Sequence, residues 1–572
     1  MLYLILARAG GGKTTHITEL IDGFSAAGKK ITLIVPEQFS FMSEKIMLGR
    51  MGAERFAGID VLSFTSLAEK LVGKPAFHER RRLDEPAKAA LMSFALETVK
   101  DKLNLYSEHT ERSSVIEEFV SLASEFKQSA VPPEQLALAA AEMEDCLLKS
   151  KLADISLTLE AYNALVGSSY FDPDDLLGEL NELLPESDYF ADRLVFIDSF
   201  RGFTAQEHKV IEHMLRRSPA VYVTLCTEDL SNMGDETDLF AHTKRTAAKL
   251  IESAKRNSVA VAKPQYLSKR SKFNNFPPHF RRYAAPELAA LEQELFSPSP
   301  NVYEDDCPGI TLCRAEDIYS ECEFIACTAK KLMRENGLRS RDIAVIATDS
   351  AAYEAPLRSA LRKCGISVFE DSRRPVDASP IVALVLSAAQ IACKGFDTEA
   401  VMRYLKTELA GLSVDETAEV ENYCYLWQIN YGDWLHEWDK NPSGFGEFTD
   451  SDAEELQRLN ELRLRIISPL CRLRDKLAEG LTGGEAAQAL LDLLEGINAP
   501  ENIRLLARRL AEQGEEGMAL ELDRIWELLM DMLDSLETVS RDRVLSPKKF
   551  FDLLKLMLNI RTVAYHITAH LS

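Results

Sequence analysis

The stretch MLYLILARAGGGKTTHITEL, residues 1–20, sets an apolar segment, a glycine-rich loop and an amphipathic segment in succession. Strand, glycine loop and helix in this order are the context of a phosphate-binding loop, because glycines leave backbone N–H groups open to phosphate oxygens. The N-terminus of the following helix adds a partial positive charge. We therefore predict a nucleotide-binding loop made of Ala7, Arg8, Ala9, Gly10, Gly11, Gly12, Lys13, Thr14 and Thr15.

Two residues of this loop carry the expected chemistry. Lys13 would reach the β- and γ-phosphates and the Thr14 hydroxyl would ligate magnesium, so ATP and Mg²⁺ are the expected cofactors. Arg8 has two interpretations, a solvated side chain or a contact to the nucleotide. The alternative for the whole loop is a plain glycine turn between a strand and a helix.

A nucleotide hydrolase also needs an Asp at the end of a second apolar strand, commonly followed by a Glu that polarises the attacking water. The segment LVFIDSF, residues 194–200, supplies Asp198 as the magnesium-side carboxylate, and Ser199 follows it. A serine cannot act as a carboxylate base, so we expect weak or absent hydrolysis by this chain alone and assign no catalytic residue. The alternative role of Asp198 is to cap the turn after its strand.

Strand and helix patterns alternate along the first ~70 residues and return later, which indicates parallel βαβ units. Between them, from about residue 86 to 184, the spacing is helical and shows no strand. A second α/β pattern comprises GITLCRAED (309–317), DIAVIATD (342–349) and ISVFED (366–371), and helical periodicity then continues to the end. The predicted fold class is α/β, with two P-loop-type parallel-sheet domains that each carry a large α-helical insertion.

The predicted domain boundaries follow these changes of period. They are 1–85 with 185–290 for the first sheet domain, 86–184 for its helical insertion, 291–307 for a linker, 308–400 for the start of the second sheet domain and 401–572 for its helical insertion. Two α/β units argue against a single P-loop kinase, which would have one such unit.

Composition narrows the function classes. A net charge of −24 argues against a generic basic coat for nucleic acids, although a local basic channel can exist in an acidic protein. The Lys- and Arg-rich segment within residues 255–307 is either a solvated connection or a phosphate-contacting loop. No apolar run approaches the ~20 residues that cross a bilayer, and LYLILA lacks the basic flank of a signal peptide, so we expect a cytoplasmic protein without membrane contact.

The ten cysteines are scattered and form no CxxC pair. They are Cys146, Cys226, Cys307, Cys313, Cys322, Cys327, Cys364, Cys393, Cys424 and Cys471. Zinc and iron–sulfur sites both lack their ligand spacing, so no metal site is expected from the cysteines. We interpret these residues as reduced thiols packed as small apolar side chains.

Several segments together resemble helicase motifs. ARAGGGKT (7–14) has the A-x-A-G-x-G-K-T form typical of superfamily-one DNA helicases, whose loop commonly begins with alanine. VPEQFSFMSEK (35–45), LSFTSLAEKL (62–71) and VFIDSFRGFTAQE (195–207) are similar to later motifs of the same group. Ser199 stands where those helicases have the catalytic glutamate.

The order of VPEQ, FIDSFRGFT, RSRDIAVIATD and RYLKTEL most closely resembles the AddB family, the B subunits of bacterial AddAB ATP-dependent helicase–nucleases, over essentially the whole chain. The resemblance implies two RecA-like domains, a heterodimer with an AddA-type helicase–nuclease subunit, and binding of double- and single-stranded DNA. It also implies a role in recombinational repair of double-strand breaks, in which a B subunit with degraded motor motifs helps to scan for a Chi-type signal.

The same family carries a C-terminal nuclease domain with an iron–sulfur cluster held by cysteines. Neither the nuclease carboxylate–lysine constellation nor a late cysteine cluster is visible in this chain, which is shorter than members of the family. We therefore expect the N-terminal portion only, from a truncated or incomplete gene, without nuclease activity of its own.

The carboxyl ends of strands form the ligand edge of parallel sheets, and in helicase-like folds this edge faces single-stranded DNA. The candidate DNA contacts on this basis are Glu37, Gln38, Thr65 and Ser66. Ordinary loop capping is the alternative for each of them.

Two other functions stay open. An independent P-loop ATPase or kinase acting on a small molecule would share the glycine loop but leave the second α/β unit unexplained. A nonenzymatic scaffold would bind nucleotide without turning it over, as a helicase-like subunit with a broken motor would.

Overall fold

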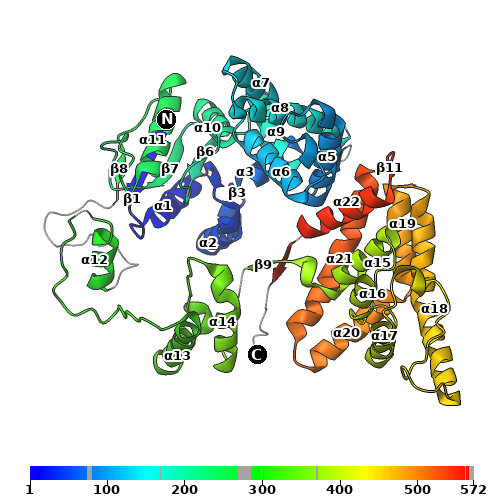
Figure 1. The fold of residues 1–572 in the computed structure, drawn as a ribbon. Coiled ribbons are helices and arrows are strands. Elements are labelled where there is room, and N and C mark those ends of the chain that lie inside the picture. The colour runs from blue at the N-terminus through cyan, green and yellow to red at the C-terminus, as the bar shows by residue number, and fades with distance from the viewer. Residues whose placement is uncertain are drawn as a thin grey trace. The chain divides into compact units, whose positions relative to one another are not determined.

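The computed structural model describes residues 1–73, 80–167, 169–267, 285–297, 299–368, 372–560 and 562–565 of the 572-residue chain. The chain forms two compact units (Figure 1). Unit 1 contains residues 1–82 and 121–312, and unit 2 contains residues 83–120 and 313–572. This grouping differs from the domain boundaries drawn from periodicity, which stay a prediction.

Unit 1 is built on a sheet of six strands. In chain order these are β1 (Leu2–Ala7), β2 (Lys30–Ile34), β3 (Ile59–Leu62), β6 (Arg193–Ile197), β7 (Val221–Cys226) and β8 (Gln265–Tyr266). They lie in the spatial order β3-β2-β6-β7-β1-β8, and each neighbouring pair is parallel. The predicted α/β architecture with a parallel sheet is confirmed for this unit.

Both faces of the sheet are buried, because successive side chains of a strand point to opposite faces. In β1, Leu2, Leu4 and Leu6 join one core and Ile5 joins the other. The first core is completed by α3 (Phe64–Val72), α9 (Leu176–Leu183), α10 (Ala205–Arg217) and α11 (Ala241–Arg256). The second core is completed by α1 (Lys13–Ala26) and α2 (Glu37–Phe56). Helices thus cover the sheet on both sides.

The helix ends are set by local chemistry. Ser63 caps α3 by accepting the backbone N–H of Ser66, and Gly73 ends this helix with a φ of 82°. Thr204 and Glu207 form a reciprocal capping box at the start of α10. Both caps fix the direction in which the chain leaves the carboxyl edge of the sheet.

The block predicted to be helical is largely so. It contains α5 (Glu85–Val99), α6 (Ser113–Gln128), α7 (Pro133–Glu142), α8 (Leu147–Val166) and α9. The prediction of no strand in it was wrong in one detail, because β5 (Tyr170–Phe171) pairs in parallel with β4 (Arg81–Arg82). A strand of two residues has no period that a sequence pattern can reveal.

Unit 2 is mainly helical. Besides α5 its helices are α13 (Ile318–Asn336), α14 (Ser350–Lys363), α15 (Pro380–Lys394), α16 (Thr398–Leu405), α17 (Val414–Trp427), α18 (Asp450–Ala478), α19 (Gly483–Gly496), α20 (Ala499–Glu512), α21 (Glu516–Val539) and α22 (Pro547–Ile560). Two short antiparallel pairs join β9 (Ser372–Pro375) to β12 (Thr562–Tyr565) and β10 (Leu481–Thr482) to β11 (Val544–Leu545). Helices α15 to α22 pack together (Figure 1), with Trp434 and Trp438 buried among them.

The predicted second parallel sheet is not confirmed. Helices α13 and α14 form and share a small core, but segments 310–315 and 343–347 pair with no strand among the residues described. Leu312 and Ile346 in these segments are 97% and 94% exposed. A strand exists only when a neighbour satisfies its N–H and C=O groups, and an alternating sequence cannot supply that neighbour.

Two sequence predictions fall outside the part of the chain that the structure describes. They concern most of the basic segment, at residues 268–284, and the end of the third strand expected in the second sheet, at residues 369–371. Among the described helices, none is both long enough and apolar enough to cross a membrane.

Candidate nucleotide site at the carboxyl edge of the sheet

The parallel sheet brings the expected site together at one edge. Because the strands of unit 1 run in the same direction, their carboxyl ends meet there, and ligands of open α/β sheets bind at this edge. The glycine loop follows β1, Asp198 follows β6, and Glu228 lies just beyond β7. Residues more than two hundred positions apart in the chain thus become neighbours.

The glycine loop has a backbone that requires glycine. Gly10 and Gly12 have φ values of 73° and 82°, in the left-handed region that other residues rarely adopt. The turn is closed by a hydrogen bond from the Gly11 N–H to the Arg8 carbonyl at 3.1 Å. Gly12 is the N-cap of α1 and offers no side chain to the first-turn N–H groups of this helix. This is a cradle in which backbone donors and the helix dipole can meet an oxyanion.

Lys13 lies over the loop. Its Nζ donates to the carbonyl oxygens of Ala7 and Arg8, at 2.9 Å each. The ammonium group is therefore held above the glycine cradle by neutral acceptors. A phosphate oxygen is a stronger, charged acceptor for the same group, because charge-assisted hydrogen bonds are about twice as strong as neutral ones.

Asp198 is buried and surrounded by hydroxyl groups. Thr14 donates to its Oδ2 at 2.8 Å, Thr224 of β7 donates to its Oδ1, and the Ser199 hydroxyl lies 3.3 Å from Oδ2. Donation from hydroxyls allows a carboxylate to be buried without a cationic partner. The structure thus brings together Thr14 and Asp198, the two residues predicted separately as magnesium ligands, and their binding of magnesium stays a prediction.

Ser199, which follows the Asp198 carboxylate, has a left-handed backbone. Its φ is 70°, a region that residues with a Cβ adopt only at a cost of about 1–2 kcal/mol. Its short hydroxyl bonds back to Asp198 and supplies no base. At the position expected to polarise water, the Ser199 hydroxyl therefore only donates a hydrogen bond to Asp198.

Arg8 is held by two carboxylates. Its Nε lies 2.9 Å from Glu292 Oε1, and its Nη1 lies 2.7 Å from Glu228 Oε1. Burial lowers the pKa of Arg8, but the hydrogen bonds to Glu292 and Glu228 outweigh burial and raise this pKa above its ordinary value. The guanidinium also lies over the Phe240 ring. Arg8 thereby anchors α12 (Pro286–Glu294), and its contact to a nucleotide stays a prediction.

Three of these residues were missed by sequence reasoning. Thr224 is a buried hydroxyl inside an apolar strand, and a polar residue in such a position is a signal of a site. Glu228 follows the same strand at the ligand edge, which is a second usable signal. Glu292 contacts the loop only because α12 is placed beside it, and no local sequence pattern predicts this contact.

The candidate DNA contacts lie at the same edge of the sheet. Glu37 and Gln38 are exposed at the start of α2, after β2, and Thr65 is half-buried at the start of α3, after β3. Ser66 is engaged locally, because its N–H and hydroxyl both bond to Ser63. Ser66 thus takes part in the cap of α3, whereas Glu37 and Gln38 present their side chains to solvent, and DNA contact by these residues stays a prediction.

The ten cysteines are free thiols, and Cys322 and Cys424 are buried as expected. The interpretation as packed apolar side chains is wrong for four exposed ones: Cys146, Cys307, Cys313 and Cys327. Burial raises the pKa of the Cys424 thiol to about 12, which keeps this group protonated. Among the described residues, no cluster of three His, Cys, Asp or Glu side chains could hold a metal ion.

The parallel sheet, the left-handed glycines and the Thr14–Asp198 hydrogen bond define an α/β unit with a glycine loop at the carboxyl edge of its sheet. Residues 4–292 match the family model described as "ADDB, N-terminal". The chain belongs to this AddB family.

Similarity to curated relatives extends beyond unit 1. The chain is 29% identical over 560 residues to the B subunit of the ATP-dependent helicase/deoxyribonuclease of Clostridium acetobutylicum, with 97% of this chain and 48% of that protein covered. It is 30% identical to proteins of the same name from Caldanaerobacter subterraneus, with 96% of this chain and 48% of the relative covered, and Clostridium tetani, with 97% and 49% covered. The chain thus spans about half the length of the relatives it matches.

Proposed function

We propose that this chain is the N-terminal, helicase-like part of the B subunit of a heterodimeric ATP-dependent helicase–nuclease that processes DNA double-strand breaks for recombinational repair. In this role it binds ATP with Mg²⁺, contacts DNA and helps to recognise a Chi-type signal. Its partner is an AddA-type helicase–nuclease subunit, which drives translocation. The names of the relatives support the complex, and the family membership supports the assignment to the B subunit.

The observation that carries the nucleotide part of the proposal is the 2.8 Å contact between Thr14 and Asp198, set beside the left-handed glycines of the loop. The N–H groups of the loop and Lys13 would hold the phosphates. The Thr14 hydroxyl and the Asp198 carboxylate would hold the magnesium ion, which neutralises phosphate charge when bound.

Weak turnover follows from Ser199. Its hydroxyl bonds to Asp198, so no carboxylate follows Asp198 to activate water. We infer a site that responds to nucleotide binding and contributes little to hydrolysis. In the complex, motor work then belongs to the partner subunit.

Co-expression of the tagged chain with an AddA-type subunit of the same genome tests the complex. We expect the two proteins to co-purify and to bind DNA ends together. Gln38→Ala should weaken binding of single-stranded DNA, whereas Gln135→Ala, at an exposed position of α7, should not. If the two proteins neither associate nor bind DNA ends, the proposal is wrong.

The second candidate function is an independent P-loop ATPase or kinase. It rests on the same loop, and the specific observation in its favour is Glu228, a carboxylate beside the loop on another strand end. Hydrolysis by the isolated chain that does not require DNA and disappears in Lys13→Ala would favour it. The ion pair between Glu228 and Arg8 argues against a free base at this position.

A further inference from the structure

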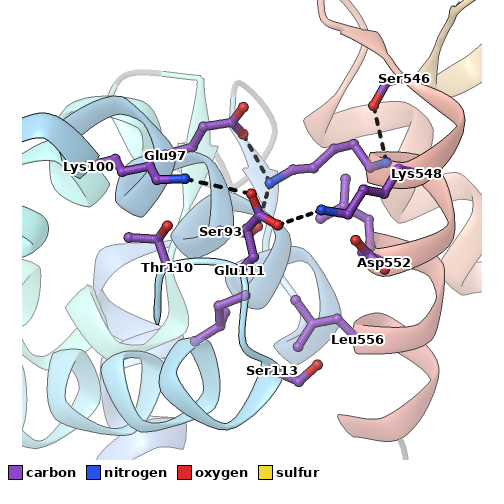
Figure 2. Close-up of a pocket in the computed structure, with 13 residues that line it drawn as sticks. Ser93, Glu97, Lys100, Thr110, Glu111, Ser113, Ser546, Lys548, Asp552 and Leu556 are labelled. Atoms are coloured by element: carbon purple, nitrogen blue, oxygen red, sulfur yellow. Dashed lines mark hydrogen bonds and ion pairs between the residues drawn. The ribbon is translucent and has the colours of Figure 1, made fainter. Parts of the chain in front are cut away.

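A separate cavity of about 230 Å³ lies in unit 2, where the end of α5, the start of α6 and the first turns of α22 come together (Figure 2). This volume is ample for an oxyanion, because roughly 10–15 Å³ of such space suffices for one water molecule. Three lysines, Lys100, Lys548 and Lys549, line it together with the hydroxyl-bearing Ser93 and Thr110. The nucleotide site of unit 1 uses none of these residues.

Two of the three lysines converge on the Glu111 carboxylate, which stands where an oxyanion would be bound. Glu111 lies with one oxygen 2.7 Å from Lys548 Nζ and the other 3.7 Å from Lys100 Nζ. The hydrogen bond from Lys548 lowers the pKa of Glu111, so this side chain is an anion at neutral pH. Figure 2 shows both lysines directed at the same carboxylate.

The third lysine is held more firmly. Lys549 Nζ contacts Glu97 at 3.0 Å and donates to the Ser93 hydroxyl at 3.0 Å, and its side chain is only 21% exposed. Ser546 accepts the backbone N–H of Lys549 at the start of α22, so the lysine stands on a fixed first turn. The first turns of α22 and α6 both border the cavity, and the N-terminal end of each helix adds partial positive charge.

A phosphate group can displace the carboxylates of Glu97 and Glu111 from their lysines at little cost in free energy. The side chains of Glu97 and Glu111 are 61% and 58% exposed, and exposed ion pairs contribute only about 0–1 kcal/mol. A phosphate group presents more acceptor oxygens to the same cations than one carboxylate does. Asp552, one turn after Lys548 on α22, adds a further carboxylate to the lining.

We propose that this cavity is a receptor for a phosphate group, in which the Glu111 carboxylate occupies the site until a phosphate displaces it. The phosphate belongs either to a DNA backbone or to a free phosphate compound. The DNA source rests on the proposed function, whereas the free source does not.

Two substitutions with opposite effects separate this role from simple structural ion pairs. Glu111→Gln removes the internal competitor and should tighten phosphate binding about fivefold, and Lys548→Ala should weaken it by a similar factor. Lys476 and Asp492 form an exposed ion pair at 2.6 Å in the same unit, so Lys476→Ala and Asp492→Asn are matched controls without an expected effect. If these ion pairs were purely structural, both test substitutions would change the phosphate affinity in the same direction.

Binding is measured on the full chain with two probes. Fluorescence anisotropy of labelled single- and double-stranded DNA measures binding of phosphate groups in a DNA backbone. Calorimetry with inorganic pyrophosphate measures binding of a free phosphate compound. The calorimetry uses a Lys13→Ala background, so that binding at the glycine loop does not contribute. Opposite shifts in either probe support the receptor and identify its source. Unchanged affinity for both probes, in folded variants, overturns it.

The two proposals fail separately. If the chain binds DNA and neither test substitution changes any affinity, the receptor is refuted and the proposed function stands. If the chain binds no DNA but pyrophosphate affinity shifts in opposite directions, the receptor stands and the proposed function loses its DNA support.

Discussion

Thr14 and Asp198 are 184 positions apart in the chain, yet the hydroxyl of one donates to the carboxylate of the other. Both are oxygen ligands of the kind that magnesium prefers, and Lys13 lies beside them on the same loop. At the scale of residues, the proposed nucleotide binding therefore rests on a few side chains that can be tested singly.

Asp198→Asn preserves the shape of this side chain and removes its charge. We expect the magnesium-dependent part of the nucleotide affinity to fall about tenfold, because a neutral amide is a weaker ligand for a divalent cation. Titration of a fluorescent ATP analogue with and without MgCl₂ measures this. Asp192→Asn, in an exposed ion pair with Lys30, is the control. An undiminished magnesium effect in Asp198→Asn would show that this carboxylate is not on the metal side.

The placement of Lys13, Thr14 and Asp198 at one edge of the sheet could be predicted because each stands in a contiguous motif that follows a strand. Glu228 and Glu292 could not, because their roles arise only when β7 and α12 are placed beside the loop. Groups within one contiguous motif can be predicted from the sequence, whereas the groups that hold Arg8 come together only in the tertiary structure.

At the scale of elements, Asp60 ties together strands that do not pair. It lies on β3 and contacts Arg193 of β6 at 2.7 Å across the intervening β2, while Lys70 of α3 contacts its other oxygen at 2.7 Å. Burial raises the pKa of Asp60, but hydrogen bonds from Lys70 and Tyr189 outweigh burial and lower the pKa below its ordinary value.

This lowered pKa makes the stability of unit 1 dependent on pH. A carboxyl group with a depressed folded-state pKa stabilises the fold fully above its unfolded value of about 3.9, and the contribution is lost as the pH falls through the folded value. We expect Asp60→Asn to lower the free energy of unfolding by about 1–2 kcal/mol at neutral pH. Urea unfolding at neutral and acidic pH measures the difference, which should narrow below about pH 4. A difference that stays constant with pH would contradict this account.

A second prediction at this scale concerns Arg8, because this residue connects the glycine loop to α12. Arg8→Ala should leave Glu228 and Glu292 without their shared cation and destabilise the docking of α12 by about 2 kcal/mol. Hydrogen exchange of residues 286–294 should therefore accelerate.

The matched control is Arg50→Ala, which breaks an exposed ion pair with Asp22. Equal exchange of α12 in the Arg8 variant and the control would show that other contacts hold this helix.

At the scale of the whole molecule, the first α/β unit was predictable and the second was not. In unit 1 the segments with a strand-like sequence pattern pair with one another in the six-stranded sheet, so the prediction and the structure agree. In unit 2, residues 343–347 carry a strand-like pattern without a paired strand among the residues described, and α13 and α14 form around their own small core. Helices need only their own backbone for hydrogen bonds, which is why the helical blocks followed from periodicity.

The central claim is that the loop at residues 7–15 binds nucleotide in a chain that turns it over weakly. Equilibrium binding of a fluorescent ATP analogue, with steady-state ATP hydrolysis on the same samples, tests it directly in the wild type and Lys13→Ala. The account predicts binding by the wild type, at least tenfold weaker binding by Lys13→Ala, and hydrolysis near background in both. Equal binding by the two proteins, or rapid hydrolysis that only the wild type performs, would contradict it.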